Sequence, residues 1–424
     1  MTGKEMGFGK NFLIGAATAA YQVEGDSTNS DVWCMEHMRY GGYKELKGAA
    51  ADHYHTYRED IRMMAEAGLN AYRFSIEWPR VEPEEGVFDE AEMAHYLDMV
   101  HACREYGLEP VVTLFHFSSP RWLITKGGWE VDSVVEDFAA YARYVCEHLQ
   151  GEDLRYLVTI NEANLGTLIA GYIAKAKAAE SAGQLQIGMD LDAMAAEEAE
   201  RRAECQEVFG VDEAAVFQSP RTTHGNELIM AAHRAAVDVV HELLPGTKAG
   251  LSLSIGDLQA APGGEARRDH EWQEVFGQFV PTIRDDDFLG LQSYTRNVFG
   301  PGGEILPGPG AELTQMGYEY YPEGIAHVAA TVSREVRGEI LITENGIATA
   351  DDDRRCDFIR TALAGVSGQI DRGVPIVGYL YWSLIDNWEW QSGYGMQFGL
   401  VELDRRTGAH IPKHSLAFLG SYTG

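Results

Sequence analysis

The stretch "LITENG" at residues 341–346 places a glutamate at the point where a β-strand should end. An apolar and β-branched run precedes Glu344, and the Asn-Gly pair that follows it is a turn signal. The stretch "LVTINEAN" at residues 157–164 has the same design, with Glu162 after a similar run. A buried carboxylate without a partner destabilises a fold. Each glutamate is therefore expected to be salt-bridged, exposed at a rim, or functional.

The rest of the chain repeats the alternation of a strand and a helix. Amphipathic segments such as residues 55–68 and 92–107 follow the β-like runs, with apolar residues at helical spacing. Eight such repeats predict a (β/α)₈ TIM barrel of the α/β class. An open doubly wound sheet is the alternative, but no Gly-rich fingerprint follows the first strand. The expected strands lie within residues 12–20, 71–76, 110–117, 156–161, 248–255, 288–294, 339–343 and 376–384.

The 424 residues could hold two or three average domains or one large barrel with insertions. The sequence contains no internal repeat beyond this alternation and no linker. We therefore predict a single barrel domain over residues 1–424. The largest insertion, residues 172–220 between the fourth and fifth strands, is rich in Ala and Glu around residues 193–209 and is predicted to be helical.

Composition narrows the class of partner. A formal charge of −31 argues against nucleic acid, because phosphate binding depends on clustered Lys and Arg. No apolar run reaches the roughly 20 residues that span a bilayer, so no membrane partner is expected. Residues 10–20 resemble a secretory signal, but polar residues follow at once, and a first barrel strand explains them better.

The five cysteines are scattered, with no C-x-x-C pair. This usage predicts a reduced, cytoplasmic protein with neither a disulfide framework nor a zinc site. Nothing in the sequence indicates an oligomeric state.

Polar side chains gather at the predicted strand ends. In barrels of this kind the active site lies at the C-terminal ends of the strands, so Glu162 and Glu344 are expected to face one another across one pocket. Paired carboxylates among aromatic, amide and imidazole side chains are typical of sites that cleave a glycosidic bond. The other side chains at these ends are Arg73, His116, Asn161, Gln292, Tyr294 and Trp382.

Four sequence blocks make the chain resemble glycoside hydrolase family 1, and β-glucosidases in particular. They are "RFSIEWPRVEP" (73–83), "TINEAN" (159–164), "ITENG" (342–346) and "YWSLIDNWEWQSGYGMQFGLVELD" (381–404). The motifs occur in the family's order over about the whole chain, which makes the resemblance specific. It implies a two-step mechanism that retains the configuration of the sugar.

The resemblance implies a role for each strand-end group. Glu344 would be the nucleophile and Glu162 the acid/base, and two such neighbours do not ionise equally easily in a dry pocket. Arg73 and Tyr294 would hold Glu344 ionised, and Asn161 would bind the sugar 2-hydroxyl. A small-molecule β-glycoside is the implied partner, and no metal or organic cofactor is implied. Candidate substrate-binding residues are Gln22, His116, Gln292, Trp382, Glu389, Trp390 and Phe398, with Trp382 near the leaving group.

Two other functions use the same barrel. A catalytically silent sugar-binding protein would typically lack one carboxylate, and both are present here. Glycosyl transfer to an acceptor other than water would use the same covalent intermediate and remains open.

The chain also departs from the family's pattern. Ala163 stands where the family usually has Pro, and Ser118 where it usually has Asp. Residues 171–184 lack the Pro-Gly-rich loop that usually borders the leaving-group site, so we expect that side of the pocket to be unusual.

The pair Glu389-Trp390 bears on the phosphorylation state of the sugar. Family members that act on 6-phosphosugars replace this pair and carry a Lys-x-Tyr element shortly after it. Here the pair is intact, and residues 396–398 read Met-Gln-Phe. The resemblance therefore predicts unphosphorylated β-D-glucosides, with β-D-fucosides and β-D-galactosides as close seconds.

Overall fold

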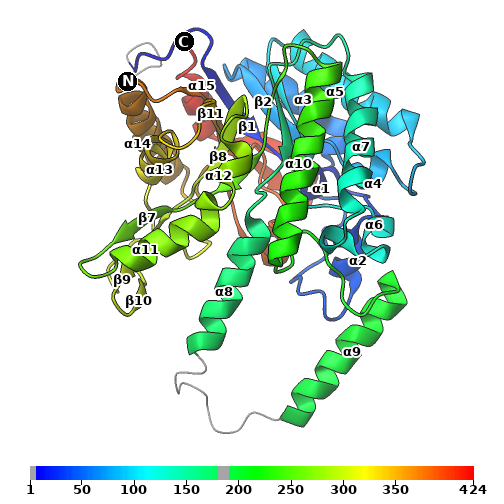
Figure 1. Ribbon diagram of the computed structural model, residues 1–424. Coiled ribbons are helices and arrows are strands. Elements are labelled where there is room, and N and C mark those ends of the chain that lie inside the picture. Colours follow the sequence, from blue (N-terminus) through cyan, green and yellow to red (C-terminus); the bar gives the residue numbers. More distant parts are fainter. Residues whose placement is uncertain (1–5, 180–190) are drawn as a thin grey trace.

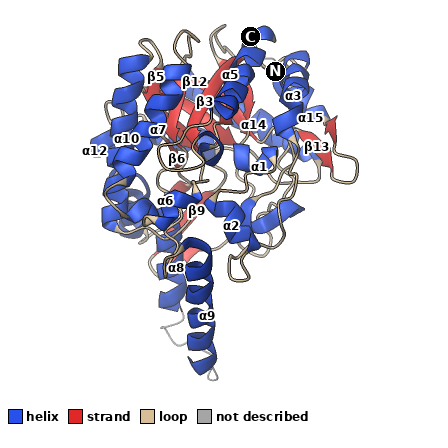
Figure 2. Ribbon diagram, turned by 90° about the vertical axis from the view of Figure 1, so that its right-hand side faces the viewer, coloured by secondary structure: helices blue, strands red, loops and turns tan. Residues whose placement is uncertain are grey.

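In the computed structural model, which describes residues 6–179 and 191–424, the strands form a parallel barrel wrapped by helices (Figures 1 and 2). All eight predicted strands are present, and the fifth is interrupted at Leu251. The TIM-barrel prediction is therefore confirmed. The barrel strands are β1 (Leu13–Ala17), β2 (Ala71–Ser75), β3 (Glu109–Phe115), β4 (Tyr156–Ile160), β5 (Lys248–Gly250), β6 (Ser252–Ser254), β8 (Phe288–Gln292), β11 (Glu339–Asn345) and β12 (Ile376–Trp382).

The barrel closes through β5 and β6, the two halves of the strand interrupted at Leu251. The sheet order is β5-β4-β3-β2-β1-β12-β11-β8-β6, and every neighbouring pair is parallel. Strand β5 pairs with β4, whereas β6 pairs with β8. Because a single residue separates β5 from β6, these two halves of one strand join the first and last members of the sheet.

The helices cover the outside of the barrel. Helix α3 matches the amphipathic segment expected at 55–68, and α5 the one at 92–107. Helix α5 begins two residues earlier than expected, because the side chain of Asp89 caps the backbone N–H groups of Ala91 and Glu92. The helices are α1 (Ala20–Glu24), α2 (Asp31–His37), α3 (His53–Glu66), α4 (Trp78–Val81), α5 (Glu90–Glu105), α6 (Arg121–Thr125), α7 (Val134–His148), α8 (Leu165–Ala179), α9 (Leu191–Phe209), α10 (Thr223–Leu243), α11 (Glu265–Trp272), α12 (Val280–Ile283), α13 (Gly324–Val332), α14 (Asp352–Ile370) and α15 (His414–Gly420).

Helices α8 and α9 project from one end of the barrel (Figures 1 and 2). Helix α9 covers residues 193–209, where the sequence pattern predicts a helix. Helix α8 begins at Leu165, directly after β4, and runs on into the expected insertion. The part of that insertion at 180–190 lies outside the described residues. No described helix is long and apolar enough to cross a bilayer.

Two small sheets complete the fold. Strands β7 (Asp257–Ala260), β9 (Arg296–Gly300) and β10 (Gly303–Ile305) form one, and β13 (Val401–Asp404) and β14 (Ala409–Pro412) form a hairpin. Residues 10–20 supply β1 and the start of α1, as expected from their strand pattern. All five cysteines are unpaired and buried.

A buried ion pair ties the β13–β14 hairpin to α3. His410 Nδ1 lies 2.6 Å from Asp60 Oδ1, and Nε2 lies 2.8 Å from the carbonyl oxygen of Ala51. Both ring nitrogens therefore face acceptors, which favours the doubly protonated imidazolium. Burial alone would lower the pKa of His410, but the bonds to Asp60 and Ala51 outweigh it and raise this pKa above its ordinary value.

This pair predicts a pH-dependent stability. Because the folded pKa of His410 is raised, its stabilisation is fully present below the unfolded pKa of about 6.5 and is lost as pH rises through the folded pKa. His410→Gln should lower the free energy of unfolding by about 1–2 kcal/mol at pH 6. Thermal denaturation of both proteins from pH 6 to 9 tests this, and a gap that widens with pH would contradict it.

Candidate active site

Glu162 and Glu344 line one cavity of about 730 Å³ at the C-terminal ends of the barrel strands. Glu344 is the penultimate residue of β11, and its side chain is buried. Glu162 follows β4 by two residues and is half-buried. The two carboxylates that the sequence places at separate strand ends therefore meet in a single pocket, as predicted.

Glu344 is held by two donors. Arg73 Nη1 donates to Glu344 Oε1 over 2.6 Å, and the Tyr294 hydroxyl donates to Oε2 over 2.6 Å. Burial raises the pKa of Glu344, while Arg73 and Tyr294 lower it and so limit the rise. Burial and the negative charge of Glu344 raise the pKa of Tyr294 well above its ordinary value, so its hydroxyl stays a donor. Both contacts favour the ionised form of Glu344.

Glu162 has the opposite environment. Burial first, and then the charge of Glu344, raise its pKa to about 8, although a hydrogen bond from Ser254 opposes them. Its backbone N–H donates to Ser252 Oγ over 3.0 Å, and its φ of 43° is the left-handed conformation that non-glycine residues rarely adopt. At neutral pH this carboxyl therefore keeps its proton while Glu344 carries the charge.

Asn161 lies between Arg73 and His116, and its bonds to both fix the tautomer of His116. Arg73 Nη2 lies 2.5 Å from one amide atom of Asn161, and because guanidinium only donates, that atom is the oxygen. The amide nitrogen therefore faces His116 Nε2, 3.0 Å away. Burial, and then Arg73, lower the pKa of His116 well below its ordinary value. The neutral ring thus accepts at Nε2 and carries its hydrogen on Nδ1, which has no partner within the described structure.

A second group of polar side chains lies around Glu389, in the segment that follows β12. Gln22 Nε2 donates to the carbonyl oxygen of Trp388 over 2.9 Å and lies 3.3 Å from Glu389 Oε2. Gln22 Oε1 is buried and has no hydrogen-bond partner in the described part of the chain. Burial and the charge of Glu344 raise the pKa of Glu389 to about 8. Gln22 thus supports the carboxyl group of Glu389 from behind, and its own amide oxygen is buried beside it.

Aromatic side chains form the walls. The ring of His116 stacks near Trp382 and Trp390, with centroids 5.7 and 6.3 Å away. Phe117 and Trp390 have φ values of 73° and 45°, so with Glu162 three cavity-lining residues adopt a strained backbone. Such strain concentrates at functional sites because the surrounding structure has to hold it in place.

Nine of the twelve predicted site residues line the cavity, and three do not. Arg73, Gln22 and Gln292 lie behind the wall and hydrogen-bond residues that line it. Gln292, expected to contact the substrate, instead donates to Asn161 Oδ1 over 2.7 Å. The nine are His116, Asn161, Glu162, Tyr294, Glu344, Trp382, Glu389, Trp390 and Phe398.

Several groups in and behind the wall were not predicted. Ser252 Oγ donates to Asn161 Oδ1 over 3.0 Å, and Thr113 Oγ1 accepts from Arg73 Nε over 2.9 Å. Both residues lie on predicted strands, so the alternation of inward-facing positions was the signal that could have identified them. Phe117, at the end of the expected strand 110–117 but beyond β3 in the structure, and Tyr318, from a loop without such a signal, also line the cavity.

One cluster among the described residues brings three potential metal ligands together. Ligand atoms of Asp352, Cys356 and His414 lie within 4.8 Å of one another. Asp352 is already occupied, because its oxygens accept from the backbone and hydroxyl of Ser415 over 2.9 and 2.6 Å and pair with Arg355. These bonds join the start of α14 to the first turn of α15, where backbone N–H groups lack partners within the helix.

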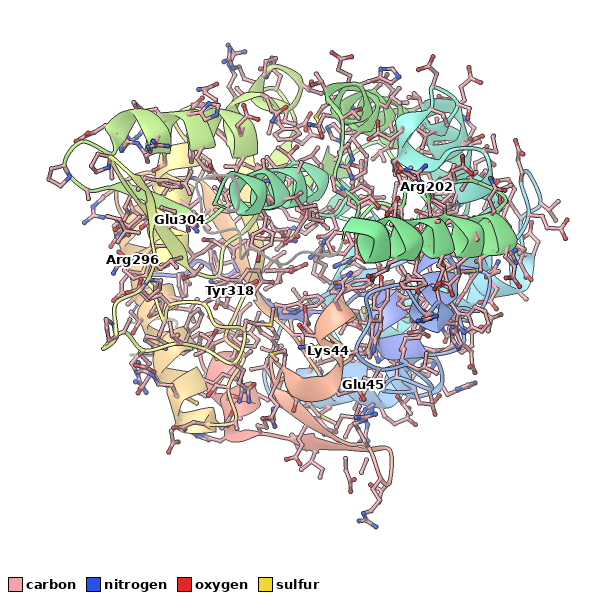
Figure 3. The ribbon with its side chains drawn as sticks, turned by 90° about the horizontal axis from the view of Figure 1, so that it is seen from below. Lys44, Glu45, Arg202, Arg296, Glu304 and Tyr318 are labelled. Atoms are coloured by element: carbon pink, nitrogen blue, oxygen red, sulfur yellow. The ribbon has the colours of Figure 1, made fainter. Side chains whose placement is uncertain are left out.

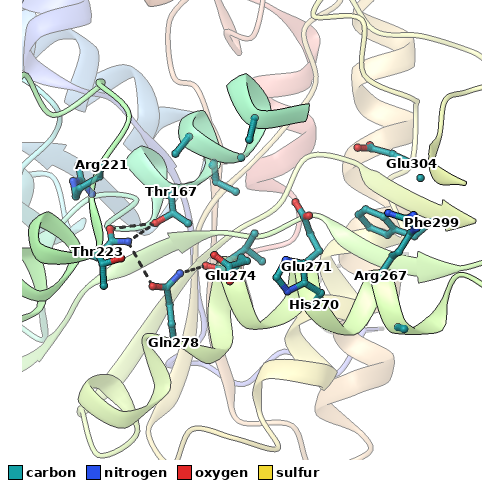
Figure 4. Close-up of a pocket in the computed structure, with 18 residues that line it drawn as sticks. Thr167, Arg221, Thr223, Arg267, His270, Glu271, Glu274, Gln278, Phe299 and Glu304 are labelled. Atoms are coloured by element: carbon teal, nitrogen blue, oxygen red, sulfur yellow. Dashed lines mark hydrogen bonds between the residues drawn. The ribbon is translucent and has the colours of Figure 1, made fainter. Parts of the chain in front are cut away.

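A larger cavity of about 920 Å³ lies between α8, α11 and the β9–β10 hairpin (Figure 4). Two of its polar side chains hold hydrogen bonds within the wall: Asn226 Nδ2 donates to Thr167 Oγ1 over 2.9 Å, and Gln278 Nε2 to the backbone carbonyl oxygen of Glu274 over 2.5 Å. Neither Glu162 nor Glu344 lines it. Size alone therefore does not identify the reactive site, whereas the meeting of strand ends does.

A TIM barrel that joins an arginine-paired carboxylate and a protonated carboxyl in one aromatic pocket is typical of a glycoside hydrolase. The model of the family "Glycosyl hydrolase family 1" matches residues 4–280 and 302–423. The chain therefore belongs to glycosyl hydrolase family 1, as the sequence motifs predicted, and it is an enzyme of the β-glucosidase type.

Relatives and solved structures agree with this assignment. A Beta-glucosidase of Agrobacterium sp. is 30% identical, over 96% of this chain and 93% of the relative. An Aryl-phospho-beta-D-glucosidase BglC of Bacillus subtilis is 28% identical, over 94% and 92%. The crystal structure of a beta-glycosidase, BGL167, aligns with a TM-score of 0.88 and 39% identity, over 98% of this chain and 97% of that one.

Proposed function

We propose that this protein is an exo-acting, retaining β-glucosidase whose substrates are unphosphorylated β-D-glucosides, β-D-fucosides and β-D-galactosides, with residues 1–424 acting as one catalytic domain. The observation that carries the proposal is the contrast between the two carboxylates. Glu344 accepts from Arg73 and Tyr294, whereas burial and Glu344 raise the pKa of Glu162 to about 8. One group is prepared to attack and the other to give a proton.

In the first step, an oxygen of Glu344 attacks the anomeric carbon while the bond from that carbon to the leaving oxygen breaks. Glu162 transfers its proton to the leaving oxygen, and a covalent glycosyl ester of Glu344 forms. Asn161 has one amide hydrogen directed at His116 and a second available for the sugar 2-hydroxyl. A bond to that hydroxyl strengthens in the transition state.

In the second step, Glu162 is a carboxylate and removes a proton from a water molecule. That water attacks the anomeric carbon, the ester breaks, and Glu344 leaves as a carboxylate again. Two inversions give net retention. The product is one sugar with its original configuration, and Glu162 regains the proton it needs for the next cycle.

The glycone is recognised by groups whose hydrogen-bonding capacity is unfilled. His116 Nδ1–H is a donor on the cavity wall without a partner among the described residues, and Gln22, behind the wall, positions Glu389 through its Nε2. Glu389 adds a carboxyl that, with a pKa raised to about 8 by burial and Glu344, can donate at neutral pH as well as accept. These groups suit the neutral hydroxyls of an unmodified sugar.

A phosphate at the sugar 6-position should be rejected. The cavity wall, as far as the structure describes it, includes no Lys or Arg, so a dianion would lose its hydration without a cation partner. It would also face the charge of Glu344, and above pH 8 that of Glu389. We expect kcat/KM for 4-nitrophenyl β-D-glucoside to exceed that for its 6-phosphate on the order of 100-fold or more.

The measurement is the ratio of these two constants at pH 6 and pH 8.5, with the β-D-galactoside and β-D-fucoside in parallel. Discrimination against the phosphate should increase at the higher pH as Glu389 ionises. A preference for the phosphorylated substrate would refute the substrate assignment. It would align this chain instead with its relative that is named an aryl-phospho-β-D-glucosidase.

A further inference from the structure

Helix α8 carries an apolar stripe whose outer part is not packed against the core. Leu165, Leu168, Ile169, Tyr172 and Ile173 follow the spacing i, i+3, i+4, i+7 and i+8 of the core-facing side of a helix. None of the five is buried, and Tyr172 is 75% exposed. All five line the cavity that contains Glu162 and Glu344.

The neighbouring helix α10 shows what this pattern normally does. Leu228, Ile229 and Ala232 have the same spacing, and all three are buried against the barrel. Exposure of apolar groups on α8 is therefore not a general property of helices in this fold. Leu165 and Leu168 at the inner end of the stripe pack against the core, whereas Ile169, Tyr172 and Ile173 are not among the described residues packed against it and line the cavity.

A second apolar surface faces the stripe. Met316 and Tyr318 line the same cavity from the loop before α13, and Tyr318 is 39% exposed. Figure 3 shows Tyr318 on the face of the molecule from which α8 and α9 project. Leu306, 77% exposed, lines a smaller cavity of about 350 Å³ that shares Leu168 and Tyr172 with the catalytic one.

This apolar region lies on the side of the acid. Ser254, which hydrogen-bonds Glu162, lines both the catalytic cavity and the smaller one. The acid must lie beside the leaving oxygen to protonate it. The sugar-binding groups His116 and Glu389 lie elsewhere in the pocket, near Trp390. A substrate with its sugar among them would extend its leaving group toward α8.

We propose that this surface is a leaving-group site for a bulky apolar aglycone, such as an alkyl chain or a fused hydrocarbon ring system, and not for a second sugar. The inference rests on the proposed glycosidase function and adds the class of leaving group to it. A sugar would need hydrogen-bonding partners on α8, where the stripe offers hydrocarbon and one phenol. The other polar groups at the mouth, Gln218, Gln391 and Ser392, belong to other segments.

The test compares leaving groups of similar chemistry and different apolar size. Methyl, butyl and octyl β-D-glucosides all release a simple alcohol, so the chemical step changes little along the series. Burial of one methylene group favours binding by up to about fourfold. We expect kcat/KM for the octyl glucoside, below its micellar concentration, to exceed that for the methyl glucoside by at least about tenfold. Cellobiose and cellotriose should not show a comparable gain with length.

The double variant Tyr172→Ser/Ile173→Ser removes the outer part of the stripe, where neither side chain is buried. It should abolish most of the octyl preference, whereas the methyl glucoside, whose leaving group has a single carbon, should change far less. Gln278→Ala, in the larger cavity beside α8, is the matched control and should change neither substrate. If Gln278→Ala reduces the octyl preference and the double variant does not, the leaving group occupies the other cavity and the proposal is wrong.

The outcomes separate this inference from the proposed function. Absence of hydrolysis of methyl and 4-nitrophenyl β-D-glucosides would reject the glycosidase itself. Hydrolysis of both with no gain along the alkyl series, or with a larger gain along the cello-oligosaccharide series, would reject only the apolar leaving-group site.

Discussion

Replacing Glu344 by glycine is expected to lower kcat by at least about 10⁴-fold, because the covalent ester of the first step can no longer form. In the unmodified protein Arg73 and Tyr294 each donate to the Glu344 carboxylate over 2.6 Å. In the variant both would face the space that this carboxylate leaves. Azide can enter that space and attack the anomeric carbon directly. With 2,4-dinitrophenyl β-D-glucoside, the product should be the α-glucosyl azide, formed by one inversion.

Identification of the anomer by NMR is the measurement that tests this role. The control is Glu274→Gln, which changes an exposed carboxylate in the larger cavity. This variant should have normal turnover and give a product with the configuration of the substrate. Near-normal turnover of Glu344→Gly without azide would remove Glu344 from the mechanism. A β-glucosyl azide from that variant would mean that a different group still forms the covalent intermediate.

The positions of the strands could be predicted because their signals are local. Each barrel strand is a short apolar or β-branched run, and a polar residue such as His116 or Glu344 marks its end. Since all strands of a TIM barrel end at the same face, separate local signals combine into one site. The break at Leu251 could not be predicted, because it depends on how β5 and β6 share two different neighbours.

The depth of each side chain was less predictable than its place along the chain. A strand-end position does not distinguish a residue on the cavity wall from one behind it. For this reason the sequence did not indicate that Gln292 lies behind Asn161 and not on the wall. The tautomer of His116 follows from a chain of bonds through Asn161 to Arg73, which joins β2 to the residues that follow β3 and β4. Such long-range contacts leave no trace in any one motif.

The apolar side of the pocket was the least predictable part. The missing Pro-Gly-rich loop indicated an unusual leaving-group side, but the sequence does not say what replaces it. The periodic stripe on α8 has the same pattern whether it faces a core or a cavity, so only the exposure of Tyr172 and its neighbours distinguishes the two. Burial is a property of the folded chain.

Replacing Glu162 by alanine should affect substrates according to their need for an acid. Octyl β-D-glucoside requires protonation of its leaving oxygen, and its kcat/KM should fall by about 10²–10⁴-fold. The 2,4-dinitrophenyl glucoside has a leaving group that departs without a proton, so its first step should change little. Its second step lacks the base, so the glucosyl ester of Glu344 should accumulate, and azide should accelerate turnover and give the β-glucosyl azide.

The pH profile separates Glu162 from Glu389, because burial and the charge of Glu344 raise the pKa of each to about 8. The first step needs Glu162 protonated, so kcat/KM for the alkyl glucoside should fall as pH rises through about 8. This basic limb should disappear in Glu162→Ala and persist in Glu389→Gln. If it instead persists without Glu162 and disappears without Glu389, the titrating acid is the sugar-binding carboxyl. Glu162 would then not be the proton donor, even though it lies beside the leaving oxygen.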